Sequence, residues 1–397
     1  MNFTPADRAR GAVLTCYACG ARAESGQRCD CGEPLWYETD PAGVAWPDAD
    51  AGGVWAFESL LPVGRPESGL ATAAGGTPLV RAPTLDADGA RVHVKLEGTN
   101  PTGSFKDRGS AVGVTAALAA GRERVGTVSH GNMAASMAAN AAGTDLDCVV
   151  LVPADIPDER LARIGAYGPR VVRVEGDYGR LYHDSLDVAG VEFVNSDSPL
   201  RVAGQKTTVL EVLAERAPDV PDAVVMPVSS GGHASAAWKA LREAEAAGLV
   251  DDPPRLYLVQ AAACAPVAAA FDRGDEEVVR LAPDEVGETV AYSIANPDPP
   301  SGTRALAAAR ATGGAVLAAD DDDIGAARDW MARAGFRVEA ASATPLAALG
   351  RLRDAGEIEA GEDVVLVATG AGYGDDAPPE SVETVRREGL AGALRAD

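Results

Sequence analysis

The chain has 397 residues, 46% of them hydrophobic, which is enough for two or three domains with sizeable cores. Its formal net charge of −24, from 59 acidic and 35 basic residues, argues against nucleic acid and anionic membranes as partners. There is no long apolar run for a membrane span, and the first residues lack the apolar core of a secretory signal, so we expect a cytoplasmic protein.

Lysine is almost absent from the chain. Lys95, Lys106, Lys206 and Lys239 are the only four among the 35 basic residues. An acidic composition with few aromatic residues is also found in disordered proteins, but the long apolar runs of this chain indicate a folded core. Acidity combined with arginine in place of lysine suits a protein that is soluble in high salt, where screening weakens self-repulsion. We therefore expect a halophilic source.

Four cysteines lie near the start of the chain. Cys16 and Cys19 form a CxxC pair, and Cys29 and Cys31 form a CxC pair nine residues later, each followed by glycine. This spacing is close to that of a zinc ribbon, so residues 1–45 are predicted to form one. Four thiolates leave no open coordination position, which indicates a structural metal. The alternatives are a ribbon without metal and a redox-active thiol cluster.

Beyond a Gly/Pro/Ala-rich stretch at 38–75, which we expect to be a linker with short helical pieces, short apolar runs alternate with helical patterns. Such alternation predicts an α/β fold with mostly parallel sheets covered on both faces. The expected strands are 91–97, 125–129, 148–153, 170–174, 223–228, 256–260 and 363–368, and the expected helices include 106–120, 132–142 and 158–166.

The first loop with unusual residues is NPTGSFKDRG at 100–109, which follows the expected strand 91–97 and opens a helix. In such folds ligands bind beyond the carboxyl ends of the strands. A lysine at a helix N-terminus faces an unfavourable dipole. A Schiff base between Lys106 and an aldehyde would remove much of that conflict and would activate carbonyl chemistry. The alternative is an ordinary surface lysine.

The second loop is SHGN, at 129–132. Gly131 lets the backbone approach a ligand, and the side chain of Asn132 can donate a hydrogen bond to an oxygen. The alternative is a simple helix cap. His130 by itself suggests a hydrogen-bonded wall residue and not an acid–base group.

The third loop, SSGGHA at 229–234, lies between an apolar strand and a helix. Glycines before a helix N-terminus form a cradle of N–H groups that suits a phosphate. The alternative is an ordinary loop with a capping serine.

The fourth loop, TGAG at 369–372, fits a dinucleotide fingerprint poorly because no βαβ unit follows it. It does offer the hydroxyl of Thr369. The four loops together supply a lysine, an amide, a phosphate cradle and a hydroxyl. That set suits the aldehyde, ring oxygen, phosphate and ring nitrogen of pyridoxal phosphate.

Six motifs then carry a resemblance over almost the whole chain. They are GGTPLVRAPTL at 75–85, KLEGTNPTGSFKDRG at 95–109, SHGNMAASMAANAAG at 129–143, VNSDSPLRVAGQKT at 194–207, PVSSGGHASAAWKA at 227–240 and VEAASATPLAAL at 338–349. In content and order they resemble the threonine synthases, among the fold type II, tryptophan-synthase-β-like pyridoxal-phosphate enzymes. The SFKDRG motif is specific for this superfamily of pyridoxal-phosphate enzymes. Within the superfamily, the NS…R…GQKT segment makes the resemblance to the threonine synthases more specific. The cysteine cluster resembles the zinc ribbon of archaeal and some bacterial members.

The resemblance implies a role for each cofactor residue. Lys106 would carry the cofactor covalently and shuttle protons, Asn132 would bond the ring oxygen, and Thr369 would bond the pyridine nitrogen. A hydroxyl at that nitrogen would favour elimination over transamination. The residues that would wrap the cofactor phosphate are Ser229, Ser230, Gly231, Gly232 and His233.

The resemblance also implies the substrate residues. Asn195, Ser196 and Arg201 match positions that hold the substrate phosphate in threonine synthases, and Arg201 would be a bidentate clamp. Ser129 and His130 would face the substrate. Lys206 lies in the GQKT part of this motif. We leave open whether it acts near the substrate site or forms a structural ion pair.

As a whole, the resemblance implies two doubly wound domains, a large one over 46–120 and 206–397 and a small one over 121–205, in a homodimer. The expected reaction converts O-phosphohomoserine and water to threonine and phosphate. SSGGH in place of a GNGGN-like loop, and SHGN in place of STGN, leave room for another amino-acid substrate. The alternatives are a threonine/serine dehydratase, a cysteate synthase-like enzyme, and a non-catalytic relative.

Overall fold

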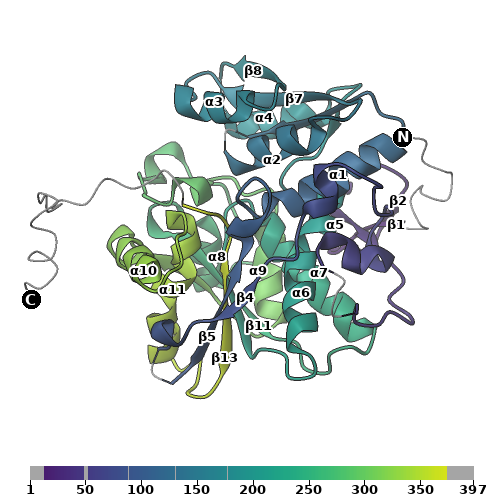
Figure 1. Ribbon diagram of the computed structural model, residues 1–397. Helices are drawn as coiled ribbons and strands as arrows, with labels where there is room; N and C mark the ends of the chain where they lie inside the picture. The colour runs from purple at the N-terminus through teal and green to yellow at the C-terminus, as the bar shows by residue number, and fades with distance from the viewer. Residues whose placement is uncertain (1–12, 49–51, 88, 130, 177, 373–397) are drawn as a thin grey trace, which may run out of the picture.

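The computed structural model describes residues 13–48, 52–87, 89–129, 131–176 and 178–372 (Figure 1). The chain begins with a small antiparallel sheet in the order β2-β1-β3. Its strands are β1 (Val13–Cys16), β2 (Arg22–Ala23) and β3 (Leu35–Glu38). In the described part of the chain no helix has the length and apolar character needed to cross a membrane.

A six-stranded sheet in the order β12-β11-β10-β13-β5-β4 forms the centre of the larger α/β unit. Its strands are β4 (Leu79–Arg81), β5 (Arg91–Leu96), β10 (Ala223–Pro227), β11 (Arg255–Ala261), β12 (Val316–Ala319) and β13 (Asp363–Ala368). All neighbours are parallel except the edge strand β4, which pairs antiparallel with β5. The central strands are continuous apolar runs because both of their faces are covered.

Successive residues of β10 show how the two faces are covered. Val225 packs into a cluster with α10 (Asp321–Arg333) and α11 (Ala340–Asp354). Val224 and Met226 point to the opposite face and pack against four other helices. These are α6 (Thr207–Arg216), α7 (Gly232–Ala246), α8 (Pro266–Arg273) and α9 (Gly302–Ala311). The sheet is therefore doubly wound, as predicted.

A second sheet, in the order β8-β7-β6-β9, is entirely parallel. Its strands are β6 (Arg124–Val128), β7 (Asp147–Pro153), β8 (Arg170–Val174) and β9 (Glu192–Phe193), and its helices are α2 (Asn132–Ala141), α3 (Asp158–Gly165) and α4 (Tyr178–Leu186). Helices α2 and α3 cover one face, and Leu181 of α4 packs on the other beside Val128 and Phe193. The α/β class with mostly parallel sheets is confirmed.

Helix α1 (Lys106–Ala119) lies between the two sheets, beside α5 (Pro199–Gln205) (Figure 1). Val114 of α1 packs with the small sheet, whereas Val112 packs with the segment before β4. The strands of each sheet fall within the residue ranges expected for the two domains, and the domain boundaries themselves stay a prediction.

The segment at 38–75 is more ordered than a linker. Two 3₁₀ helices, η2 (Val54–Leu60) and η3 (Leu70–Ala73), lie in it, and the side chains of Trp55 and Leu61 are buried. The indole Nε1 of Trp55 donates to the carbonyl of Ala71 over 2.7 Å. The short helical pieces are confirmed, but the linker is wrong, because apolar residues between the glycines and prolines pack into the core.

Candidate active site

The lysine loop and the TGAG loop meet through their backbones at the start of α1. Ser104 forms a β-bridge with Gly370, and the amide of Phe105 donates to the carbonyl of Thr369 over 3.0 Å. Lys106 is the first residue of the helix. Residues about 265 positions apart in the sequence are thus fixed side by side, as binding at the carboxyl ends of parallel strands requires.

Lys106 is half-buried in this junction, and its Nζ lies 4.3 Å from the centre of the Phe105 ring. Burial, followed by the positive charge of Arg201, lowers the pKa of Lys106 to about 7 against the opposing effect of Glu339. Much of this amine is therefore neutral at neutral pH. The neutral amine is the nucleophilic form that condenses with a carbonyl.

The SSGGH loop forms the N-terminus of the 15-residue helix α7. Gly231 has a φ of 82°, and a Cβ there would collide with the carbonyl oxygen of Ser301. A Cβ on Gly232 would collide with the carbonyl oxygen of Ser196. Within the described chain, no backbone hydrogen bond uses the amides of Ser229 to His233 as donors. Free amides at a helix N-terminus suit a phosphate group.

His233 packs directly against the lysine loop. Its ring stacks on Phe105 with centroids 4.0 Å apart, and its Nε2 lies 3.1 Å from Oγ1 of Thr208. Burial and the nearby charge of Lys106 hold the pKa of His233 well below its usual range, so the ring is neutral. Its buried Nδ1 has no hydrogen-bond partner among the described residues, which leaves one polar atom for a ligand.

Two residues of the VEAASATPLAAL segment also belong to the site, and we did not single them out from the sequence. Oγ of Ser342 lies 2.9 Å from Oγ1 of Thr369. The Asn132 amide donates to Oε2 of Glu339 over 3.0 Å. The motif resemblance at 338–349 was the signal that could have identified Glu339 and Ser342.

The residues expected to hold a substrate phosphate differ in their surroundings. The carbonyl of Ser196 contacts the start of α7. Asn195 is fully buried, where its Oδ1 accepts from the amide of Val128 over 2.9 Å and its Nδ2 donates to Ser185 over 2.9 Å. The Asn195 side chain therefore holds the loop after β9 against β6 and α4, and contact with a substrate would require it to exchange these bonds.

Arg201 is also fully buried, but no carboxylate of the described residues accepts a hydrogen bond from it. Its guanidinium donates to the carbonyls of Val194 and Lys106, at 2.9 and 3.2 Å, and to the hydroxyl of Ser110. Burial lowers the pKa of Arg201 to about 9, although Asp107 opposes this effect. A buried positive charge beside Lys106 favours an anion in the site.

Ser129 lies at the end of β6, where its Oγ accepts a hydrogen bond from the amide of Gly131 over 3.2 Å. This contact is a local turn and not a helix cap, because Gly131 is the N-cap of α2 and no side chain of the described residues caps that helix. His130 lies outside the described residues, so its expected position facing a substrate stays a prediction.

Lys206 has a structural role. Its Nζ lies 2.5 Å from Oε2 of Glu243 and 2.6 Å from the carbonyl of Leu60. Of the two interpretations left open, the structure supports the ion pair.

The four N-terminal cysteines converge on one point. Their Sγ atoms all lie within 4.8 Å of one another, with 3.6 Å between Cys16 and Cys31 and 3.6 Å between Cys19 and Cys29. Tetrahedral zinc with four thiolates places sulfur atoms about 3.8 Å apart. The donor set and its spacing therefore fit a four-coordinate structural metal.

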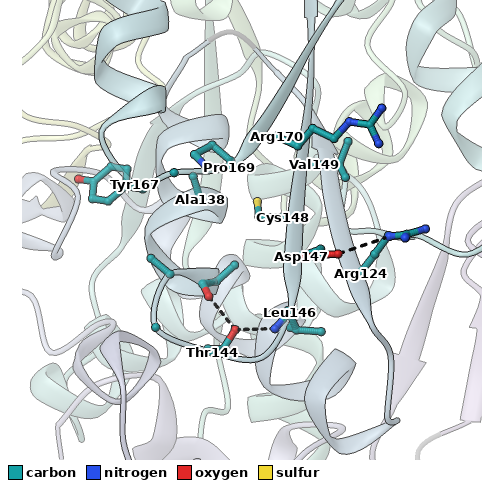
Figure 2. Close-up of a pocket in the computed structure, with 14 residues that line it drawn as sticks. Arg124, Ala138, Thr144, Leu146, Asp147, Cys148, Val149, Tyr167, Pro169 and Arg170 are labelled. Atoms are coloured by element: carbon teal, nitrogen blue, oxygen red, sulfur yellow. Dashed lines mark hydrogen bonds and ion pairs between the residues drawn. The ribbon is translucent and has the colours of Figure 1, made fainter.

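A separate cavity of about 420 Å³ lies at the other end of the small sheet (Figure 2). It is lined by Arg124, Asp147 and Arg170, which are the first residues of β6, β7 and β8. The lysine loop and its partners lie instead at the carboxyl ends of strands. This cavity is therefore not part of the candidate active site.

The family model described as pyridoxal-phosphate dependent enzyme matches residues 70–370, which include the lysine, SHGN and SSGGH loops and the first two residues of the TGAG loop. The chain belongs to that family. Lys106, the free amides at the start of α7 and the hydroxyl pair of Thr369 and Ser342 are suitable for the aldehyde, phosphate and ring nitrogen of the cofactor.

Curated proteins resemble the chain over most of its length. The threonine synthase of Methanocaldococcus jannaschii is 37% identical over 334 residues, which cover 81% of each chain. The threonine synthase of Mycobacterium leprae is 37% identical over 83% of this chain and 89% of its own. The solved serine racemase from Dictyostelium discoideum has a TM-score of 0.61 at 22% identity, covers 75% of this chain and 92% of its own, and shows the shared fold.

We expect the cofactor-free protein to capture pyridoxal phosphate at a rate that rises with pH through about 7 and levels off about one unit higher. The rate follows the fraction of neutral Lys106, whose pKa is lowered to about 7. A lysine with an ordinary pKa of about 10.4 would give a rate that still climbs at pH 9 to 10. Stopped-flow absorbance across this pH range measures the midpoint, and a midpoint above about 9 would contradict the shifted pKa.

Proposed function

We propose that the chain is a threonine synthase, a lyase that converts O-phosphohomoserine and water to threonine and phosphate. The observation that carries this proposal is a neutral lysine between two anion-binding features. One is the set of free amides at the start of α7, which suits the cofactor phosphate. The other is the buried charge of Arg201 beside Lys106, which suits a second, substrate phosphate. The 37% identity to threonine synthases supports the same conclusion.

When bound, pyridoxal phosphate supplies an electron sink for a carbanion at the substrate α-carbon. Lys106, about half of which is neutral near pH 7, would take the α-proton and return protons at neighbouring carbons. The amides of Ser229, Ser230, Gly231, Gly232 and His233 hold the cofactor phosphate. Thr369, bonded to Ser342, presents a hydroxyl and not a carboxylate to the ring nitrogen. A hydroxyl at this position would leave the ring nitrogen unprotonated, which would favour elimination over transamination.

The remaining residues position the cofactor ring and the substrate. Asn132 would bond the ring oxygen, in exchange for the hydrogen bond that its amide donates to Glu339. Ser129, His130, Ser196 and Arg201 surround the substrate and its phosphate. Asn195 takes part either directly or by holding the loop that carries Ser196.

We also propose a bound metal, an oligomeric state, a location and a source for the protein. Zinc occupies the site formed by Cys16, Cys19, Cys29 and Cys31, whose sulfur spacing supports it. We also propose a cytoplasmic location and a homodimer, of which only the homodimer is implied by the resemblance to threonine synthases. Its net charge of −24 and its four lysines support a halophilic source.

A second candidate keeps the cofactor and changes the substrate. His233 stands where the family has an amide, and its Nδ1 is free for a ligand. This difference motivates a threonine/serine dehydratase or a cysteate synthase-like enzyme as the second candidate.

A substrate panel in high potassium chloride tests the proposal. We expect O-phosphohomoserine to give equal amounts of phosphate and threonine, and we expect threonine and serine to give little ammonia. The Lys106→Ala variant serves as the background for both assays. Ammonia and keto-acid formation without release of phosphate would reject threonine synthase in favour of the dehydratase.

A further inference from the structure

Arg28 joins the cysteine ribbon to two segments of the α/β body. It immediately precedes Cys29, and its side chain is 23% exposed. One guanidinium nitrogen donates to the carbonyl of Gly32 within the ribbon. The other donates to the carbonyl of Pro300 over 2.7 Å and forms an ion pair with Oδ2 of Asp197 at 3.3 Å.

Both of these segments border the phosphate cradle. Asp197 follows Ser196, whose carbonyl oxygen occupies the space where Gly232 would carry a side chain. Pro300 precedes Ser301, whose amide donates to the carbonyl of Ser230 over 2.9 Å. The segments contacted by Arg28 are therefore those that set the position of the loop at the start of α7.

Other contacts fix the partners of Arg28 in place. The Tyr182 hydroxyl donates to the second oxygen of Asp197 over 2.6 Å, and Asp197 is only 1% exposed. The fully buried Arg304 donates to Oγ of Ser301 over 3.1 Å and to the carbonyl of Pro34 in the ribbon over 3.3 Å. Two arginines thus connect the ribbon to the same edge of the cradle.

We propose that Arg28 is a positioning residue that couples the metal-bound ribbon to the affinity of the active site for the cofactor phosphate. Arg28 contacts neither the cradle amides nor Lys106. It acts by holding Ser196 and Ser301 against the glycines of the SSGGH loop. These contacts orient the free amides of the loop towards one phosphate position. The inference rests on the proposed zinc in the ribbon and on the cofactor of the family.

The test compares Arg28→Met with Arg22→Met, which removes an exposed arginine from the same ribbon. Cofactor-free protein is titrated with pyridoxal phosphate and, separately, with pyridoxal, which lacks the phosphate. We expect Arg28→Met to weaken pyridoxal phosphate binding roughly tenfold, as the loss of charged hydrogen bonds implies, and to leave pyridoxal binding unchanged. We expect Arg22→Met to match the wild type and Arg28→Lys to recover part of the loss.

Equal weakening of both ligands by Arg28→Met, or no weakening of either, would overturn the proposal. Wild-type protein stripped of zinc by a chelator should show the same selective loss. If removal of the metal left the ratio of the affinities for pyridoxal phosphate and pyridoxal unchanged, the proposed coupling between metal and active site would be overturned. Both titrations are independent of the substrate, so a failed substrate panel leaves this result interpretable. If the purified protein contains no zinc, the proposed metal is wrong. The comparison of Arg28→Met with the wild type still tests the positioning role of Arg28.

Discussion

Replacement of Lys106 by alanine is expected to give a colourless protein that borohydride does not label and that has lost catalysis. The side chain is the half-buried amine of the site, with its pKa lowered to about 7. It provides both the covalent attachment and the proton transfers, and proton transfer alone contributes about 10²- to 10⁴-fold. We therefore expect a loss of at least about 10³-fold in kcat. Absorbance of the purified variant and release of phosphate from O-phosphohomoserine measure the two effects.

The wild-type protein supplies the control, because the chain has only three other lysines. Lys95 is ion-paired with Glu211 at 2.9 Å, and Lys239 with Glu243 at 3.0 Å. The third is Lys206, paired within the core. Reduction with borohydride should attach the cofactor mass to Lys106 alone. A mass tag on another lysine, or a yellow Lys106→Ala protein, would contradict the assignment.

The largest effect on stability is expected for Arg108→Met. The Arg108 guanidinium is fully buried between Glu97 and Glu211, with contacts of 2.7 and 2.6 Å. Burial alone would raise the pKa of Glu211, but Arg108 reverses this effect and lowers it to about 2. Removal of the arginine leaves two carboxylates in the core without their main countercharge. We expect the free energy of unfolding to fall by about 3–5 kcal/mol, as measured by urea unfolding at fixed salt.

Arg124→Met is the matched control for this substitution. The Arg124 side chain is 52% exposed, and its pair with Asp147 spans 3.7 Å. Exposed pairs of this kind contribute at most about 1 kcal/mol. A loss of stability in Arg108→Met no larger than that in Arg124→Met would show that the buried network is not important for folding.

Much of the fold could be predicted because local signals were strong. The strands at 170–174 and 363–368 match β8 and β13 residue for residue, since each is a short run rich in valine. The lysine loop and the glycine loop could be found for a similar reason. A lysine is unusual at a helix N-terminus, and two successive glycines there leave backbone amides accessible to a ligand.

Other features depend on contacts between distant residues, which no local pattern reveals. The sequence does not show that the Asn195 amide faces the backbone of Val128, 67 residues away, and not a ligand. It does not show that Trp55 finds a partner at Ala71 and so orders an apparent linker. Glu339 belongs to the site only because α11 begins beside the TGAG loop.

The order of strands in the large sheet has a consequence for synthesis of the protein. Arg91 of β5 lies beside Asp363 of β13, 272 residues later in the chain. The four-stranded sheet is complete once Phe193 has left the ribosome, but β5 must wait for almost the entire polypeptide. Until then its apolar edge is open to wrong partners, and such long-range pairing is slow. Nascent chains that stall before β13 are therefore expected to need chaperone protection.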